Sequence, residues 1–169
     1  LFKEYIALSN DTILEKTYYD GSQLMVTYKN WEGARNGMSY HYRVTGELVI
    51  EQFFIDNKVH GWYKTFYPNG NLVRYEKVDM GFFIDTSYYY NEDGSLYSKA
   101  IYKEPCEMGN NECNQIVMMY SDNTLVYSYE VIEGLASQNH QIYNSDKYKK
   151  LKKEWDEVTP IEVGETIFK

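Results

Sequence analysis

The feature that most constrains the fold is a leucine that returns every 24 residues. Leu24, Leu48, Leu72 and Leu96 keep this spacing, and Leu125 follows after a step of 29. A pair of small or polar residues precedes each leucine: Asp20-Gly21, Thr45-Gly46, Asn69-Gly70, Asp93-Gly94 and Asp122-Asn123. Such residues are typical of tight turns, and Gly and Asn in particular tolerate positive φ. The sequence therefore predicts a repeat with a tight turn before each leucine.

Other columns of residues keep the same register. Six residues before the leucines stand Tyr18, Tyr42, Phe66, Tyr90 and Met119, and one residue after them stand Met25, Val49, Val73, Tyr97 and Val126. Eleven residues before them stand Gly37, Gly61, Asp85 and Asn114, which we expect in turns. The first copy has Ile13 there, so it is either degenerate or an end cap. Each unit reads as strand, tight turn, strand, loop, with strands over 61–67 and 72–78 around a turn at 68–71.

Stacked hairpins are the fold that this pattern favours. One hairpin is marginal in water, whereas neighbouring hairpins share a sheet and bury common columns. The 19 tyrosines suit such a sheet, because broad side chains pack well across pleated strands. We expect a single all-β domain over 1–169, with hairpin repeats over 13–135 forming an extended meandering antiparallel sheet. Phe66 and Leu72 should be columns of its shared core.

The longer last step carries both cysteines of the chain, Cys106 and Cys113, around a turn at Gly109-Asn110-Asn111. A disulfide across this loop requires Cα atoms within about 7 Å. It would stabilise the fold by about 2 to 3 kcal/mol and imply an oxidising compartment. The alternative is a pair of reduced thiols. Zinc is less favoured, because two cysteines without a nearby histidine make half a site.

The pattern changes to that of a helix over 144–158, with Asn144 or Ser145 as N-cap. Apolar positions recur at helical spacing at Tyr148, Leu151, Trp155 and Val158, and Pro160 limits the C-terminus. The other face carries Lys147, Lys149, Lys150, Lys152 and Lys153. A basic amphipathic helix can bind anionic membranes, but Glu154, Asp156 and Glu157 weaken that signal. We expect the helix to cap the sheet, and the segment after Pro160 to add a short strand.

Charge restricts the partners. The formal net charge is −8 and the isoelectric point is about 4.9, so nucleic acids and anionic membranes are disfavoured and a basic protein partner is favoured. A moderately acidic balance is also an ordinary solubility device. Apolar runs are too short for a transmembrane helix.

No catalytic pattern stands out. His41, His60 and His140 lie outside metal-binding motifs, and no nucleophile elbow, phosphate-binding loop or dinucleotide fingerprint occurs. Asp20 and Asp93 recur because they turn the chain. We expect a protein without enzymatic activity, catalytic residues, cofactor or metal.

Aromatic residues are the remaining candidates for function. Trp62, Tyr63, Tyr88 and Tyr89 form two adjacent pairs in neighbouring units. Because strand side chains alternate, Trp62 and Tyr63 should lie on opposite faces, as should Tyr88 and Tyr89. One interpretation is a core set with a second set loosely covering the other face. The other is an exposed surface for a protein partner, since Tyr and Trp dominate binding hot spots.

The stretch "DNKVHGWYKTFYPNGNLV" resembles the bacterial variant of the MORN repeat. The matching residues in this copy are Gly61, Trp62, Phe66, Tyr67, Asn69, Gly70 and Leu72. The next copy matches at Tyr90, Asp93, Gly94 and Leu96, and the previous one at Gly37, Tyr42, Gly46 and Leu48. The resemblance covers roughly 13–130 and is strong over 36–102. Asp85 in place of glycine, the expanded spacer and the helical tail depart from the motif.

The resemblance implies a non-enzymatic bacterial interaction module. Proteins of this type include the YwqK-type antitoxins, so the chain would be an antitoxin or immunity protein that occludes a basic toxin. The alternative is an exported or envelope-associated structural repeat protein. A Cys106–Cys113 bridge would favour the exported alternative, and a periplasmic or surface location over a cytoplasmic one.

Overall fold

The computed structural model describes residues 1–9, 11–19, 22–30 and 32–157. Within them the chain forms one antiparallel sheet of 14 strands, as the sequence predicts, followed by a helix. The strands are β1 Phe2–Ala7, β2 Thr12–Tyr19, β3 Ser22–Asn30, β4 Arg35–Tyr42, β5 Leu48–Ile55, β6 Lys58–Phe66, β7 Leu72–Asp79, β8 Phe82–Phe83, β9 Thr86–Tyr90, β10 Leu96–Tyr102, β11 Cys106–Glu107, β12 Gln115–Ser121, β13 Thr124–Ile132 and β14 Leu135–Ile142.

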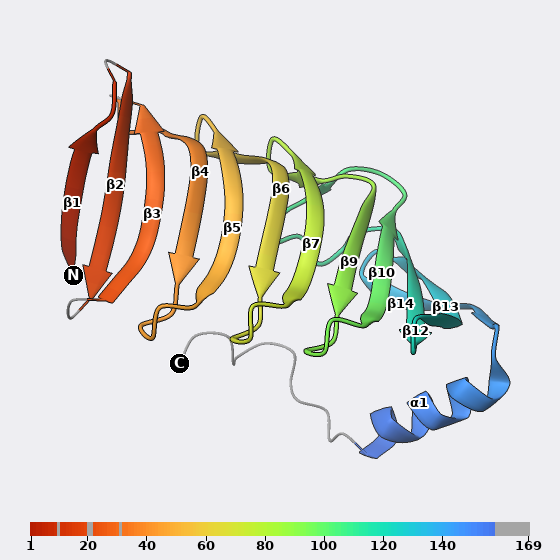
Figure 1. The fold of residues 1–169 in the computed structure, drawn as a ribbon. Coiled ribbons are helices and arrows are strands. Elements are labelled where there is room, and N and C mark those ends of the chain that lie inside the picture. Colours follow the sequence, from red (N-terminus) through yellow and green to blue (C-terminus); the bar gives the residue numbers. More distant parts are fainter. Residues whose placement is uncertain (10, 20–21, 31, 158–169) are drawn as a thin grey trace.

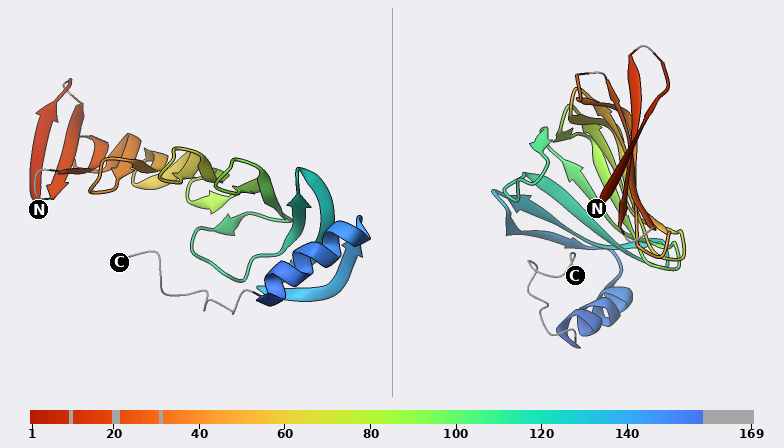
Figure 2. Two further views of the ribbon diagram at one scale, coloured as in Figure 1. Left: turned by 60° about the horizontal axis from the view of Figure 1, so that its bottom comes forward. Right: turned by 90° about the vertical axis from the view of Figure 1, so that its left-hand side faces the viewer.

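The sheet is a single open layer in which strands follow one another in chain order (Figure 1). Each strand pairs with the next, apart from the short β8 and β11, which pair with each other beside β7. Figure 2 shows that the strands rotate progressively, so that β12–β14 run across the direction of β1–β3. This accumulated twist is the usual right-handed twist of extended strands.

Tight turns connect the strands at both rims of the sheet. The sequence predicts a tight turn at one rim and a longer loop at the other, and for most units the prediction of a longer loop is wrong. On one side, Gly46, Gly70 and Gly94 have positive φ and end three-residue loops. On the other side, Asp56-Asn57 and Met80-Gly81 form two-residue turns with both φ positive. The chain is thus a continuous meander, in which a repeat boundary can be drawn at either rim.

The column one residue after each leucine marks a β-bulge. Tyr42 pairs with Leu48 and His41 with Ile50, which leaves Val49 as the extra residue. The same shift leaves Val73, Tyr97 and Val126 as extra residues in later copies. The first copy has Leu24 there instead of Met25, because Tyr18 pairs with Gln23. In the last copy Tyr120, and not Met119, pairs with Leu125. In the first and last copies, the pairing beside the turn is therefore shifted by one residue relative to the pairing in the three middle copies.

Gly37 and Gly61 lie inside strands, which corrects the expectation of turns. Both have positive φ, 109° and 79°, at places where the ladder shifts register between neighbouring strands. A Cβ on Gly37 would lie 3.0 Å from the Cβ of Tyr28, so glycine also fits the space. In the next copy Asp85 takes positive φ at the same position, and here the strand is interrupted between β8 and β9. These positions are bulges of the kind that glycine favours.

Most members of the predicted columns are not among the most buried side chains, and Met119 and Val126 are the exceptions. Phe66 and Leu72 are half-buried, and so are Tyr42 and Tyr90. The side chains that lose almost all exposure include Phe54, Val78 and Val126 together with polar residues: Glu15, Thr17, Thr27, Ser39, Gln52, Glu76, Ser87 and Ser98. Polar residues of the strand centres therefore share the core with apolar residues such as Phe54, Val78 and Val126.

Cys106 and Cys113 are joined by a disulfide, with their Cα atoms 5.7 Å apart. Both residues are buried. The loop is held to the sheet through the β8–β11 pair and through a hydrogen bond from the Glu133 amide to Asn114 Oδ1 of 2.9 Å. The insertion is thus an ordered part of the sheet margin.

The helix α1 spans Ser145–Glu157, and Asn144 is its N-cap, since Asn144 Oδ1 accepts a hydrogen bond of 3.0 Å from the Lys147 amide. It packs chiefly on β13 through Tyr148, whose ring lies 5.0 Å from that of Tyr127, and through the buried Leu151. The side chain of Trp155, Val158 and the strand expected after Pro160 lie outside what the structure describes.

Candidate functional site

Aromatic rings run across one face of the sheet in a line that we call the aromatic stripe, made of Trp62, Tyr75, Tyr88, Lys99 and Tyr120. Trp62 stacks on Tyr75 with ring centroids 4.8 Å apart, and Tyr75 lies 6.1 Å from Tyr88. The Lys99 ammonium lies 5.3 Å from the ring centroids of both Tyr88 and Tyr120. Trp62 is the most open member, with 47% of its surface exposed.

The stripe follows from strand register. Lys64 pairs with Tyr75, Tyr75 with Tyr88, and Tyr88 with Lys99, so these side chains stand on one face of β6, β7, β9 and β10. Trp62 lies two residues from Lys64 and therefore on the same face. Cross-strand aromatic and cation–π contacts of this kind each stabilise a sheet by about 0.2–1 kcal/mol.

Tyr63 and Tyr89 belong to the opposite face, which we call the polar face. The Arg74 guanidinium lies 4.9 Å from the Tyr63 ring centroid, and its Nε lies 3.3 Å from Glu76 Oε2. The Tyr89 hydroxyl donates a hydrogen bond of 3.3 Å to Glu76 Oε1. Two of the four candidate residues therefore surround a buried ion pair.

Glu76 is fully buried, and burial raises its pKa, although the Arg74 charge opposes the change. Its Oε2 faces Arg74 without making a hydrogen bond among the residues described. Burial, and then the charge of Glu76, raises the pKa of Tyr89, so this phenol stays protonated. The group can hold charge inside the sheet, but its reactive atoms are enclosed by neighbouring side chains. Its geometry is that of a structural network.

The polar face continues along the sheet as a row of directly opposed residues, the polar row: Glu15, Thr27, Ser39, Gln52, Tyr63 and Glu76. Thr27 Oγ1 and Ser39 Oγ are 2.9 Å apart. Burial alone would raise the pKa of Glu15, but hydrogen bonds from Lys29 at 2.8 Å and Lys3 at 3.2 Å lower it overall. Long neighbours cover the short side chains of this row, which explains burial in a single layer.

The structure separates the predicted binding residues into Trp62 with Tyr88 and Tyr63 with Tyr89, as strand alternation predicts. Sequence reasoning missed Tyr75, Lys99 and Tyr120, and it missed Arg74 with Glu76. The signal lay in cross-strand pairing: once the bulge after each leucine is known, Lys64, Tyr75 and Tyr88 fall opposite one another.

Within the described ranges, no three His, Cys, Asp or Glu side chains are placed to hold a metal ion. The same part of the chain has no helix of sufficient length and apolar character to cross a membrane.

No protein-family model matches the chain, and no curated protein does. One matching solved structure is the crystal structure of accessory secretory protein 1, 2 and 3 in Streptococcus pneumoniae, with 17% sequence identity, a TM-score of 0.33 and coverage of 70% of this chain. The chain spans only 19% of the length of that protein. A likeness this weak carries no argument about function.

Proposed function

We propose that this chain is a non-enzymatic protein-binding module of MORN-like repeats, and that the aromatic stripe is its docking surface. The observation that carries the proposal is Trp62, 47% exposed and held in place by stacking on Tyr75. Tryptophan and tyrosine supply the largest binding energies at protein interfaces. Rings already ordered by their neighbours lose little conformational freedom on binding.

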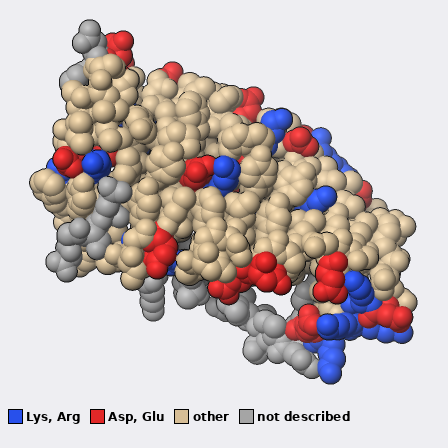
Figure 3. Space-filling view, in the orientation of Figure 1, with Lys and Arg blue, Asp and Glu red and all other residues tan. Residues whose placement is uncertain are grey.

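A basic protein is the partner that the charge distribution favours. Figure 3 shows acidic groups along the lower rim of the sheet. The tight turns of that rim contain the exposed Glu92 and Asp93 as well as Glu47. A basic surface would therefore meet hydrophobic rings at its centre and carboxylates at one rim, which speeds encounter and fixes orientation. An antitoxin or immunity protein that covers a basic toxin is the concrete form of this proposal.

The test uses the product of the gene beside the one for this chain. The two proteins are produced together, and complex formation and survival of the producing cells are measured. We expect a stable complex and protection against a toxic neighbour. Retention of no partner, together with no gain in resistance, would count against an antitoxin.

Trp62→Ala sharpens the test. It should weaken the complex about 30-fold, the effect of losing about 2 kcal/mol at a hot spot. Tyr5→Ala is the matched control, because Tyr5 is 60% exposed in β1, far along the sheet from the stripe. Equal losses for both variants would contradict a specific surface at the stripe.

The disulfide favours a second candidate, an exported or envelope-associated structural repeat protein. Cys106 and Cys113 are themselves buried and form a disulfide, and structural disulfides persist in oxidising compartments. Mass measurement after the protein is unfolded and alkylated without a reductant separates the two candidates. Two alkylated thiols would oppose export, whereas an unmodified pair would support it.

A further inference from the structure

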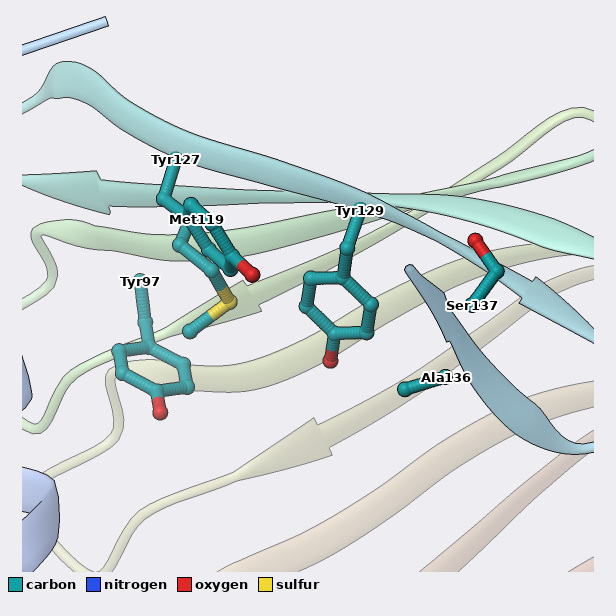
Figure 4. Close-up of a pocket in the computed structure, with 6 residues that line it drawn as sticks. All are labelled: Tyr97, Met119, Tyr127, Tyr129, Ala136 and Ser137. Carbon is teal, nitrogen blue, oxygen red and sulfur yellow. The ribbon is translucent and has the colours of Figure 1, made fainter. Parts of the chain in front are cut away.

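A cavity of about 350 Å³ opens on the polar face near the end of the sheet, apart from the aromatic stripe. It is lined by Tyr97 of β10, Met119 of β12, Tyr127 and Tyr129 of β13, and Ala136 and Ser137 of β14. Figure 4 shows the rings of Tyr97 and Tyr129 extending from their strands on either side of the Met119 sulfur. The volume lies at the small end of the range for ligand sites.

A bulge in β14 shapes one wall of the cavity. Tyr129 pairs with His140, but Val131 pairs with Ala136, so β14 carries two more residues than β13 over this stretch. The extra length bends β14 away from the ladder, as the curved ribbon in Figure 4 shows. Ala136 and Ser137 are thereby placed beside the space that the tyrosines border.

Three of the lining residues are tyrosines at repeat positions where the other copies have a different residue. At the bulge position, other copies have Leu24, Val49, Val73 and Val126 where this copy has Tyr97. At the centre of the return strand, other copies have Thr27, Gln52, Glu76 and Ala100 where the last has Tyr129. Tyr127 likewise replaces Met25, Ile50, Arg74 and Ser98. The other copies fold without tyrosine at these positions. Tyr127 packs against Tyr148 of α1, whereas the packing of the repeat does not require the rings of Tyr97 and Tyr129.

The lining excludes charged and strongly polar ligands. No charged side chain borders the cavity, so an ion there would lack a partner. A sugar would leave several hydroxyls facing Met119, Ala136 and the ring carbons. An aromatic ring fits better, because tyrosine rings favour offset or edge-to-face neighbours and methionine sulfur contacts ring edges.

Hydroxyl groups supply the polar part of the site. Within the residues that the structure describes, the hydroxyls of Tyr97 and Tyr129 have no hydrogen-bond partner. Ser137 of β14 also lines the cavity, on the side of Tyr129 away from Tyr97 in the view of Figure 4. A ligand that carries one hydroxyl or N–H group on its ring could satisfy one of these groups while the ring stays among apolar atoms.

We propose that this cavity binds an uncharged aromatic ring bearing one hydrogen-bonding group, such as a phenol or an indole. The ring can belong to a free compound or to an exposed tyrosine or tryptophan of a bound protein. The proposal is independent of the aromatic stripe and holds whether or not that surface binds a partner.

The test follows the Met119 methyl group by NMR in protein labelled at the methyls of its six methionines, with Met119→Leu for assignment. Titration with p-cresol should move this signal in a saturable way. Benzoate and glucose, as charged and polar probes, should leave it unchanged. Toluene should bind more weakly than p-cresol. Absence of saturation with p-cresol, or equal binding of benzoate, glucose or toluene, would overturn the proposal.

Variants connect the signal to the cavity. Tyr97→Val restores the residue of other copies, so the fold should persist while p-cresol affinity falls about three- to tenfold. Ala136→Leu fills the space and should abolish binding. Tyr75→Val, on the opposite face, should change nothing. Unaltered affinity in both cavity variants would refute the site.

A further arm identifies the source of the ring. N-acetyl-tyrosinamide presents a tyrosine side chain with blocked backbone groups. Binding at least as tight as that of p-cresol supports a partner's side chain as the natural occupant, and binding of p-cresol alone supports a free compound.

Discussion

The two faces of the sheet reverse the ordinary relation between residue type and burial. The polar row holds carboxylates and hydroxyls that are almost completely buried, whereas the aromatic stripe on the other face leaves Trp62 47% exposed. In a single layer, no second sheet covers either face. Burial is then decided by the neighbouring side chains of the same face, so Thr27 and Ser39 can be buried while Trp62 remains exposed.

Under the proposed function, this difference assigns stability to the polar face and recognition to the aromatic stripe. The polar row pairs its groups internally, through the Arg74–Glu76 and Lys29–Glu15 ion pairs and the Thr27–Ser39 hydroxyls, although Glu76 Oε2 makes no hydrogen bond among the described residues. Its side chains are therefore committed to the fold. The stripe makes ring contacts but keeps open surface, and it is free to take a partner. Four experiments on stability test this division.

The largest effect is expected from Arg74→Met. It removes the cation beside the fully buried Glu76 and should lower the free energy of unfolding by about 3 kcal/mol, because an uncompensated buried charge is costly. Urea denaturation at neutral pH measures the change. Lys77→Met, at an exposed position of the same strand, is the control and should cost less than about 0.5 kcal/mol. Similar losses for both would show that the polar face does not dominate stability.

Ser39→Ala should cost about 1–3 kcal/mol, because it leaves the buried Thr27 hydroxyl without its partner at 2.9 Å. Adding Thr27→Val removes the second hydroxyl and should recover much of the loss. A double-mutant cycle by chemical denaturation measures the coupling. Simple additivity of the two changes would argue that the hydroxyl pair is not a unit.

Glu76 and Glu15 should give opposite pH dependences. Burial raises the pKa of Glu76 above its ordinary value of 4.5, so the folded state holds this proton more tightly. Its contribution is complete below that value and is lost as pH rises through the folded-state pKa, by at most about 1.4 kcal/mol per pH unit. The stability of Glu76→Gln relative to the parent should therefore rise with pH in that window.

Glu15 has a lowered pKa, so its contribution is present above 4.5 and is lost as pH falls. The stability of Glu15→Gln relative to the parent should rise as the solution is acidified. Denaturation curves for both variants from pH 3 to pH 8 check the signs. Parallel pH profiles for the two variants would contradict the different environments assigned to these carboxylates.

The smallest effect is expected from Trp62→Leu on the aromatic stripe. Trp62 loses one stacking contact, and its exposed half gains nothing from burial, so the cost should be about 1 kcal/mol or less. Thermal unfolding measures it. A cost comparable to that of Arg74→Met would place the stripe in the core and weaken its assignment as a docking surface.

Much of the fold was predictable because the same pattern of a turn followed by a leucine recurs along the chain. Five turns before five leucines predict the antiparallel order and the approximate bounds of the strands around them, but the five hairpins do not account for all 14 strands. The split of Trp62 from Tyr63 follows from alternation alone. The bulge after each leucine was not predictable, since the extra residue keeps the 24-residue spacing and leaves no gap in the sequence.

The prediction that Phe66 and Leu72 form the core shows where reasoning from a sequence pattern fails. Phe66 and Leu72 are apolar and recur, which in a two-layered protein would place them inside. From the sequence alone, Glu76 would be placed at the surface. The structure shows that it is buried, with Arg74 and Tyr89 around it. The cavity had a visible signal in Tyr97, the one aromatic residue in an aliphatic column, but Ala136 and Ser137 reach it only through the bend of β14.

Because the sheet is a meander with tight turns at both rims, its length can change in whole repeat units. Each 24-residue unit adds two strands, or about 10 Å of sheet, without altering the register of those already laid down. The turns at Arg43–Glu47 and Tyr67–Asn71 make corresponding backbone hydrogen bonds. Deletion of residues 43–66 would therefore put the second turn in the place of the first. A lineage could lengthen or shorten such a ribbon by unequal exchange of its gene, changing its span in steps while keeping each face intact.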